Sequence, residues 1–144
     1  MATVQNSKKG VASRKLEEWF GWGVDTELEY SRLARSRLSP TTVSILEDIG
    51  FSRDETSWII SPRAISERIR SQKMLTVDES AKVIRLARLA ALAENVFGGP
   101  EKARRWLSKS KRKLNGLTPL EATKDEFGAR VVTQMLIEID SGMY

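Results

Sequence analysis

The stretch that decides the fold is Phe97-Gly98-Gly99-Pro100-Glu101-Lys102-Ala103-Arg104-Arg105-Trp106-Leu107, followed by Leu114-Asn115-Gly116-Leu117-Thr118-Pro119-Leu120-Glu121. Gly98 and Gly99 end one helix, and Pro100 stands at the first position of the next. Thr118-Pro119-Leu120-Glu121 combines a capping box with a proline at the first helical position. The sequence therefore predicts short helices with sharp boundaries, and it closes on Ile139-Asp140-Ser141-Gly142-Met143-Tyr144.

Two longer helices are predicted on either side of this stretch. Thr76-Val77-Asp78-Glu79 is a capping box that opens a helix to about Phe97, with apolar residues on more than one side. The last helix is expected from about Asp125 to Asp140, with a core stripe made of Phe127, Val131, Met135 and Ile139. Because no segment alternates with a period of two, the chain is predicted to be all-α.

A helix-turn-helix is predicted upstream. Short helices are expected over Pro40–Ile49, Arg53–Ile60 and Pro62–Ser71, and the second and third meet at Ser61-Pro62. In the third helix Ile65 and Ile69 are expected to be buried, which turns the polar face outward. The predicted DNA-binding residues are Ser61, Arg63, Ser66, Glu67 and Arg70. The alternative is a three-helix scaffold with a solvated charged face.

Three regions follow from these elements. Residues 1–24 form a basic arm, flexible to Arg14, and an aromatic segment; residues 25–74 form the helix-turn-helix region; residues 75–144 form a C-terminal helical domain. Charge separates them further. The net charge is +5, and residues 99–116 hold seven basic residues against one acidic residue. A basic block beside an acidic last helix indicates two surfaces with different partners.

Composition excludes several classes of function. The chain has 144 residues, 40% of them hydrophobic, with no cysteine and no histidine. Disulfides, thiolate metal sites and histidine-based catalytic triads are therefore excluded, and no metal or cofactor is expected. An enzyme would need a Ser/Lys or carboxylate pair, and no spacing indicates one. The sequence shows neither a signal-peptide core nor a membrane-spanning helix, so a cytoplasmic protein without a membrane partner is expected.

The C-terminal motifs occur together in a known family. They are Val96-Phe97-Gly98, Lys102-Ala103-Arg104-Arg105-Trp106-Leu107, Leu114-Asn115-Gly116-Leu117-Thr118-Pro119-Leu120-Glu121 and Ile139-Asp140-Ser141-Gly142-Met143-Tyr144. As a set they resemble the toxin-binding domain of the MbcA/ParS/Xre antitoxins, and the resemblance extends over about Glu27 to Tyr144. One departure is Ser110-Lys111, where the family usually has Pro-Asn, so contacts made by those two family residues do not transfer.

The resemblance implies a function. The chain would be the antitoxin of a type II toxin–antitoxin module, an inhibitor rather than an enzyme, whose partner is a RES-domain toxin that consumes NAD. It would also repress its own operon by binding operator DNA, as a homodimer within a larger complex, with the long helix building the dimer. The implied toxin-binding residues are Trp106, Lys111, Arg112, Asp140, Ser141, Gly142, Met143 and Tyr144. The last five would plug the toxin's nucleotide site.

Other interpretations remain open for individual residues. Trp106 is more often a core anchor than a partner contact, and a run such as Lys109–Lys113 is usually a solvated loop. Its functional interpretation is a surface facing DNA phosphates or an acidic cleft. The alternative function is a stand-alone helix-turn-helix transcriptional regulator without an enzyme partner.

Overall fold

A computed structural model describes residues 10–142 of the chain. Within that range the protein has nine α-helices, one 3-10 helix and no strand, which confirms the all-α prediction. The elements are α2 (Val11–Phe20), α3 (Glu27–Arg35), α4 (Thr41–Asp48), α5 (Arg53–Thr56), α6 (Pro62–Ser71), α7 (Val77–Phe97), α8 (Pro100–Leu107), η1 (Arg112–Leu114), α9 (Pro119–Ala122) and α10 (Glu126–Asp140). None of these helices is long and apolar enough to cross a membrane.

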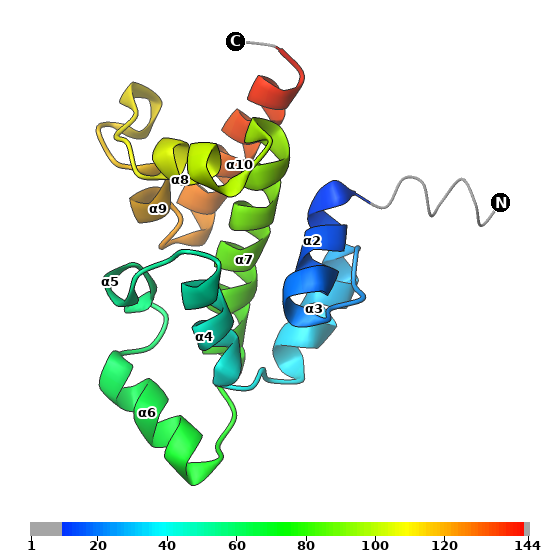
Figure 1. Cartoon of the computed structure of the whole chain (residues 1–144), viewed down its shortest axis with the longest axis vertical. Coiled ribbons are helices and arrows are strands. Elements are labelled where there is room, and N and C mark those ends of the chain that lie inside the picture. Colours follow the sequence, from blue (N-terminus) through cyan, green and yellow to red (C-terminus); the bar gives the residue numbers. More distant parts are fainter. Residues whose placement is uncertain (1–9, 143–144) are drawn as a thin grey trace, which may run out of the picture.

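Helix α7 is the central element, and the other helices are arranged around it (Figure 1). It contacts α2 and α3 on one side, α4 near its start, and α8 and α10 elsewhere along its length. The apolar arc predicted for this helix is confirmed, since residues on two different sides of it, such as Ile84 and Leu89, are buried. The expectation that α7 builds a homodimer loses its structural basis, because helices of the same chain cover these sides.

One continuous core joins the three predicted regions. It contains buried side chains from α2, α3, α4, α7, α8 and α10, among them Leu16, Tyr30, Leu46, Leu86, Leu107 and Leu136. The core is therefore not divided at the predicted boundaries after residues 24 and 74. Whether the three regions differ in function stays a prediction. Helix α2 also begins at Val11, so residues 11–14 are helical and the expected flexible arm is wrong there.

Side-chain caps set the start of most of the described helices, although α2, α4 and α8 have none. Thr76 with Glu79 and Thr118 with Glu121 form the two predicted capping boxes, and Ser61 caps α6 ahead of Pro62. The second helix of the predicted helix-turn-helix is shorter than expected. It ends at Thr56 instead of Ile60, and the following turn carries Ile59 and Ile60 into the core.

The core stripe predicted for α10 is wrong by one position. Phe127 is 77% exposed and Val131 is 45% exposed, whereas Val132 and Leu136 are fully buried. The buried side is set by Gly128, because a Cβ there would lie 1.9 Å from the carbonyl oxygen of Ala122. Only glycine lets α9 approach α10 this closely, so α10 turns the face that bears Gly128 toward the core.

Candidate functional site

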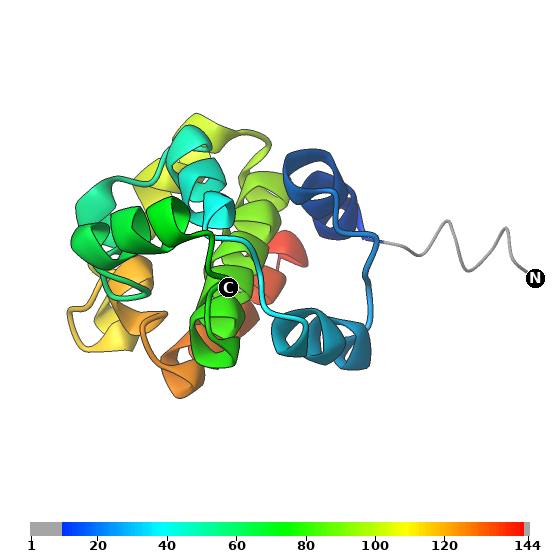
Figure 2. The ribbon, with the colours of Figure 1, turned by 90° about the horizontal axis from the view of Figure 1, so that it is seen from below.

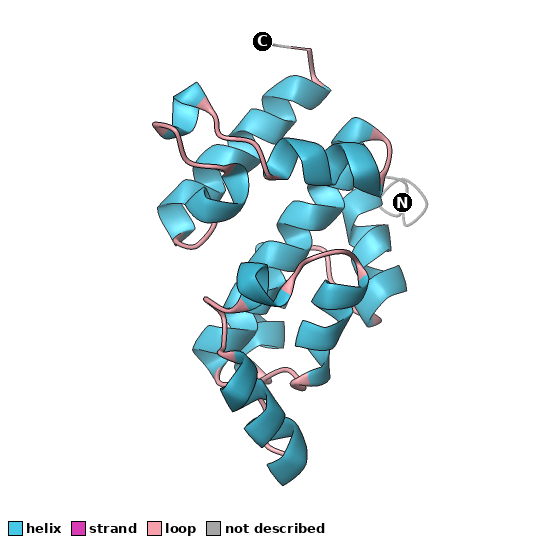
Figure 3. Ribbon diagram, turned by 60° about the vertical axis from the view of Figure 1, so that its left-hand side comes forward, coloured by secondary structure: helices cyan, strands magenta, loops and turns pink. Residues whose placement is uncertain are grey.

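Helix α6 is the predicted DNA-recognition helix, and it projects from the lower end of the molecule (Figures 1 and 3). None of its residues is fully buried. Ile65 is half-buried, but Ile69 is 47% exposed, so the prediction that Ile69 is buried is wrong. Helix α6 makes few close contacts with the other helices, which leaves Ile69 uncovered.

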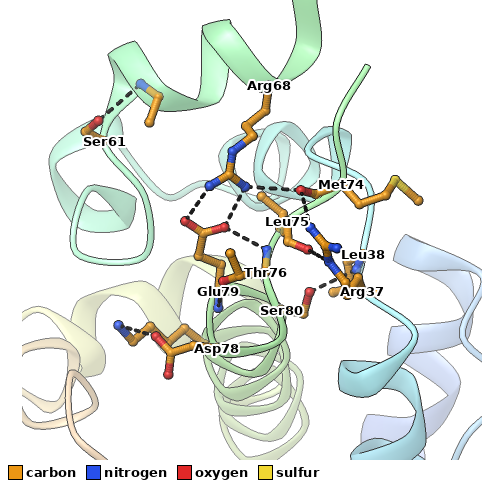
Figure 4. A network of polar contacts seen from close by, with 12 residues as sticks. Arg37, Leu38, Ser61, Arg68, Met74, Leu75, Thr76, Asp78, Glu79 and Ser80 are labelled. Atoms are coloured by element: carbon orange, nitrogen blue, oxygen red, sulfur yellow. Dashed lines mark hydrogen bonds and ion pairs between the residues drawn. The ribbon is translucent and has the colours of Figure 1, made fainter. Parts of the chain in front are cut away.

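A polar network ties α6 to the start of α7 (Figure 4). The Arg68 guanidinium donates to Glu79 through Nη1–Oε1 at 2.7 Å and Nη2–Oε2 at 3.2 Å. It also donates to the backbone oxygen of Met74 at 3.1 Å. On the other side of the same loop, Arg37 donates to the backbone oxygen of Leu75 at 2.8 Å. The position of α6 therefore depends on two arginines more than on apolar packing.

Glu79 is the acidic centre of this network. Burial alone would raise the pKa of its carboxyl, but hydrogen bonds from Arg68 and from the backbone of Thr76 lower it below the ordinary value. The carboxylate caps α7 and anchors α6 at the same time. This double role joins the predicted recognition helix to the central helix through one ionised group.

The five predicted DNA-binding residues are all exposed on α6 or at its cap. The hydroxyls of Ser61 and Ser66 bond to the helix itself, to the Ala64 amide and the Pro62 carbonyl respectively. Glu67 and Arg70 form an ion pair with each other. Arg63 is left as the exposed cation of this group for which no ion pair is found among the described residues.

Trp106 and the loop after α8 form the first part of the predicted toxin-binding site. The Trp106 ring is half-buried, with its centroid 5.5 Å from that of Phe97, in keeping with a core anchor. The Lys111 ammonium lies 4.9 Å from the centre of the same ring, on its outer side. Arg112 is exposed on η1. This part of the site therefore presents cations over an aromatic anchor.

The end of α10 forms the second part. Asp140, Ser141 and Gly142 are exposed, and the Ser141 hydroxyl donates to the Ile137 backbone oxygen at 3.0 Å. Met143 and Tyr144 lie outside the described residues. Figure 1 shows the last turn of α10 at the top of the molecule, above the end of α7. The two parts of the predicted site therefore sit on different elements that share α7 as their support.

Sequence reasoning missed an apolar surface on α10. Phe127, Val131 and Ile137 are large, apolar and exposed on its outer side. The signal was present but ambiguous, because apolar residues occur in adjacent pairs such as Val131-Val132. Either member of each pair could face the core, and Gly128 was the residue that decided between them.

A cavity of about 570 Å³ lies between α2, α3, α7 and α10; Figure 2 shows these helices from below. Four of its charged residues form two ion pairs. Arg88 pairs with Glu27 and lies 4.1 Å over the Tyr30 ring, and Arg130 pairs with Glu126. The hydrogen bond from Arg88 lowers the pKa of Glu27, which keeps that carboxyl ionised. Within residues 10–142, no group of acidic side chains is arranged to hold a metal ion.

Comparison with known proteins finds similarities that include the C-terminal part of the chain. Residues 92–142 match the model of the antitoxin Xre/MbcA/ParS C-terminal toxin-binding domain. The chain is also 43% identical over 88 residues to a curated protein named Antitoxin Xre from Pseudomonas putida strain KT2440. That match covers 61% of this chain and 55% of the relative, so the chain spans little more than half of the relative's length.

Proposed function

We propose that the protein is the antitoxin of a type II toxin–antitoxin module, because residues 92–142 match the C-terminal toxin-binding domain of the Xre/MbcA/ParS antitoxins. Its partner is a RES-domain toxin that consumes NAD. The antitoxin acts in the cytoplasm by occlusion and catalyses no reaction. The description of its relative as an antitoxin and the absence of histidine and cysteine from the sequence support this proposal.

The observation that carries the proposal is the outer face of α10. Phe127 exposes 77% of its surface and lies one helical turn from Val131, so the two side chains form one apolar strip. A large exposed apolar side chain is a common anchor of protein–protein interfaces. The strip runs along the same helix whose end carries Asp140. Docking of this face onto the toxin would direct residues 140–144 toward the toxin's active site.

The mechanism is steric occlusion assisted by charge. The exposed Asp140 carboxylate is suited to pair with cationic groups, which a nucleotide-binding site needs for phosphate. Trp106 contributes by holding α8 in place against Phe97. Lys111 and Arg112 remain predicted toxin contacts.

The proposal is tested by co-purification and by growth protection. The double variant Phe127→Ser/Val131→Ser should retain its helical content, lose most of its co-purification with the co-expressed RES-domain toxin, and protect cells poorly. The matched control is Leu28→Ser on α3, which removes a side chain that is 65% exposed. Wild-type binding and protection by the double variant would contradict the proposal.

We also propose that the protein represses its own operon and that α6 contacts the operator DNA. Arg63 is exposed and free to approach a base edge or a phosphate, and Ser61-Pro62 provides the tight entry that a recognition helix requires. A homodimer would place two such helices on a symmetric operator. Because the apolar faces of α7 are covered within the chain, the dimer would form through other surfaces, such as the exposed side chains of Ile69, Met74 and Val77 between α6 and the start of α7. The alternative, a regulator without an enzyme partner, predicts no toxin gene beside this one.

A further inference from the structure

A second charged surface lies on α8 and the loop that follows it, residues 108–117. We call it the basic edge, and it consists of Lys102, Arg105, Lys109, Lys111, Arg112 and Lys113. Glu101 is the only acidic residue between positions 99 and 116. Five of the six cationic side chains are exposed, and Lys111 is half-buried over the Trp106 ring.

The cations of the basic edge have no acidic partner in the part of the chain that the structure describes. Among residues 10–142, no ion pair involves any of the six, whereas the neighbouring Arg104 pairs with Glu55 at 2.7 Å. Helix α6 is different, because Arg68 pairs with Glu79 and Arg70 pairs with Glu67. The strongest concentration of free positive charge is therefore on α8 and its loop, not on the predicted recognition helix.

The cations also lie close enough to repel one another. Arg105 and Lys109 line the same open cavity of about 580 Å³, beside Ser108 and Gly50. Burial lowers the pKa of Lys111, and the positive charge of Lys109 lowers it further. An anion with several charged oxygens would relieve the repulsion between these side chains. An isolated lysine has no such repulsion to relieve.

The loop presents its charges on a well-defined backbone. The Lys111 amide donates to the Leu117 oxygen, and the Leu114 and Gly116 amides both donate to the Lys111 oxygen, each at 3.0 Å. Leu114 is buried and fixes the loop to the body. The backbone that carries these cations is therefore already ordered, so binding orders little additional backbone.

We propose that the basic edge binds the phosphate backbone of double-stranded DNA without reading its sequence. Lysine is depleted in the cores of protein–protein interfaces, whereas a patch of lysine and arginine of a single sign suits a phosphate backbone. The edge offers few exposed apolar side chains of the kind that anchor a protein partner; Leu117 is its one large exposed apolar neighbour among the described residues. Phosphate contacts supply affinity and orientation, and base contacts supply specificity.

This inference does not depend on sequence recognition by α6, and it gives Lys111 and Arg112, which are also predicted toxin contacts, a second partner. In the proposed repressor, α6 would read the operator while the basic edge supplies the salt-dependent part of the affinity. If α6 does not read bases, the edge still binds duplexes of any sequence. Failure of base reading by α6 and failure of duplex binding by the basic edge can therefore be told apart by using two duplexes. One duplex comes from the region upstream of the gene and the other has an unrelated sequence.

The experiment measures binding of the full chain to both duplexes by fluorescence anisotropy over a series of salt concentrations. The test variant is Lys109→Gln/Arg112→Gln/Lys113→Gln, which removes three exposed charges. It should weaken binding to both duplexes equally, by about tenfold or more at moderate salt. It should also lower the salt slope by about 2.7, because each neutralised phosphate accounts for about 0.9 of that slope. The charge-retaining variant Lys109→Arg/Arg112→Lys/Lys113→Arg should bind as the wild type does.

A matched control distinguishes the effect of the basic edge from the effect of a lower net charge. The variant Arg14→Gln/Arg32→Gln/Arg35→Gln removes three exposed cations from α2 and α3 and should keep nearly the wild-type slope. The proposal is overturned if the wild type binds neither duplex at low salt, or if the control loses as much as the test variant. It is also overturned if the test variant keeps its DNA binding and instead loses co-purification with the toxin, since the edge would then contact an acidic protein surface.

Discussion

Gly128 in the first turn of α10 lies directly against the backbone of Ala122 in α9, and a Cβ on Gly128 would lie 1.9 Å from the Ala122 oxygen. This contact decides which face of α10 is buried. Val132 and Leu136, one and two turns further on, follow Gly128 into the core. Phe127 and Val131 are consequently left on the surface, where the proposed toxin contact is made.

The first prediction is that Gly128→Ala destabilises the fold. A methyl group cannot fit without moving α9 away from α10, so the free energy of unfolding should fall by about 1–3 kcal/mol. Urea denaturation checks this. The control is Gly23→Ala, because a Cβ on Gly23 meets no atom within 4 Å. Equal stability of the two variants would show that α9 and α10 are not packed as described.

The second prediction concerns acid. Because the pKa of Glu79 is lowered in the folded state, its ion pair with Arg68 stabilises the protein at pH values above the ordinary 4.5. That stabilisation is lost as the pH falls through the lower folded pKa. The variant Glu79→Gln keeps an acceptor for the capping box but has no charge to titrate. Its stability should depend less on pH in this range than that of the wild type, measured by denaturation at several pH values; identical pH profiles would contradict the assignment.

The third prediction is that Leu89→Glu unfolds the chain instead of separating subunits. Leu89 is only 4% exposed and is covered within its own chain, so the variant buries an unpaired charge. Loss of the packed leucine alone costs about 2–5 kcal/mol. Circular dichroism should show lost helix, whereas Leu28→Glu on the exposed side of α3 should stay folded. A folded, monomeric Leu89→Glu protein would mean that α7 is a subunit interface after all.

The fourth prediction separates two arginines on α6. Arg63→Ala should weaken operator binding by about 1–3 kcal/mol and change base preference at one position, if Arg63 reads a base. Arg70→Ala should have a smaller effect that is alike for all sequences, because Glu67 already neutralises Arg70. Gel shifts with operator and mutated operator DNA measure both. Absence of any complex at low salt would rule out DNA binding by either residue.

The sequence predicts the elements well where a local signal exists. Thr76, Thr118 and Ser61 each cap a helix within a residue of the predicted start, because capping depends on neighbouring residues only. The faces of helices are harder to predict. Ile69 and Phe127 are apolar residues at helical spacing, yet both are exposed. Their burial depends on which other helix lies opposite, and periodicity contains no information on that.

In the candidate sites, too, the features that depend on neighbouring residues are predicted and those that depend on packing are not. The sequence identifies Trp106 as an aromatic anchor and the run Lys109–Lys113 as a basic loop, and both interpretations are consistent with the structure. It does not reveal that Arg70 is neutralised by Glu67 or that Arg68 is bound to Glu79. Such pairs decide which cations are free to bind a partner. The exposed strip of Phe127 and Val131 was missed for the same reason, since it depends on the packing of Gly128 on α9.

The central claim is that the end of α10 inhibits the toxin, and the most direct measurement is neutralisation by a chain that lacks Ser141–Tyr144. Because Asp140 and Ser141 are exposed and α10 is held by Val132 and Leu136, the truncated protein should keep its fold. It should still co-purify with the RES-domain toxin through the α10 face, but NAD consumption by the complex should return. If the truncated chain protects cells against the co-expressed toxin as well as the full chain does, the end of α10 is not the inhibitor.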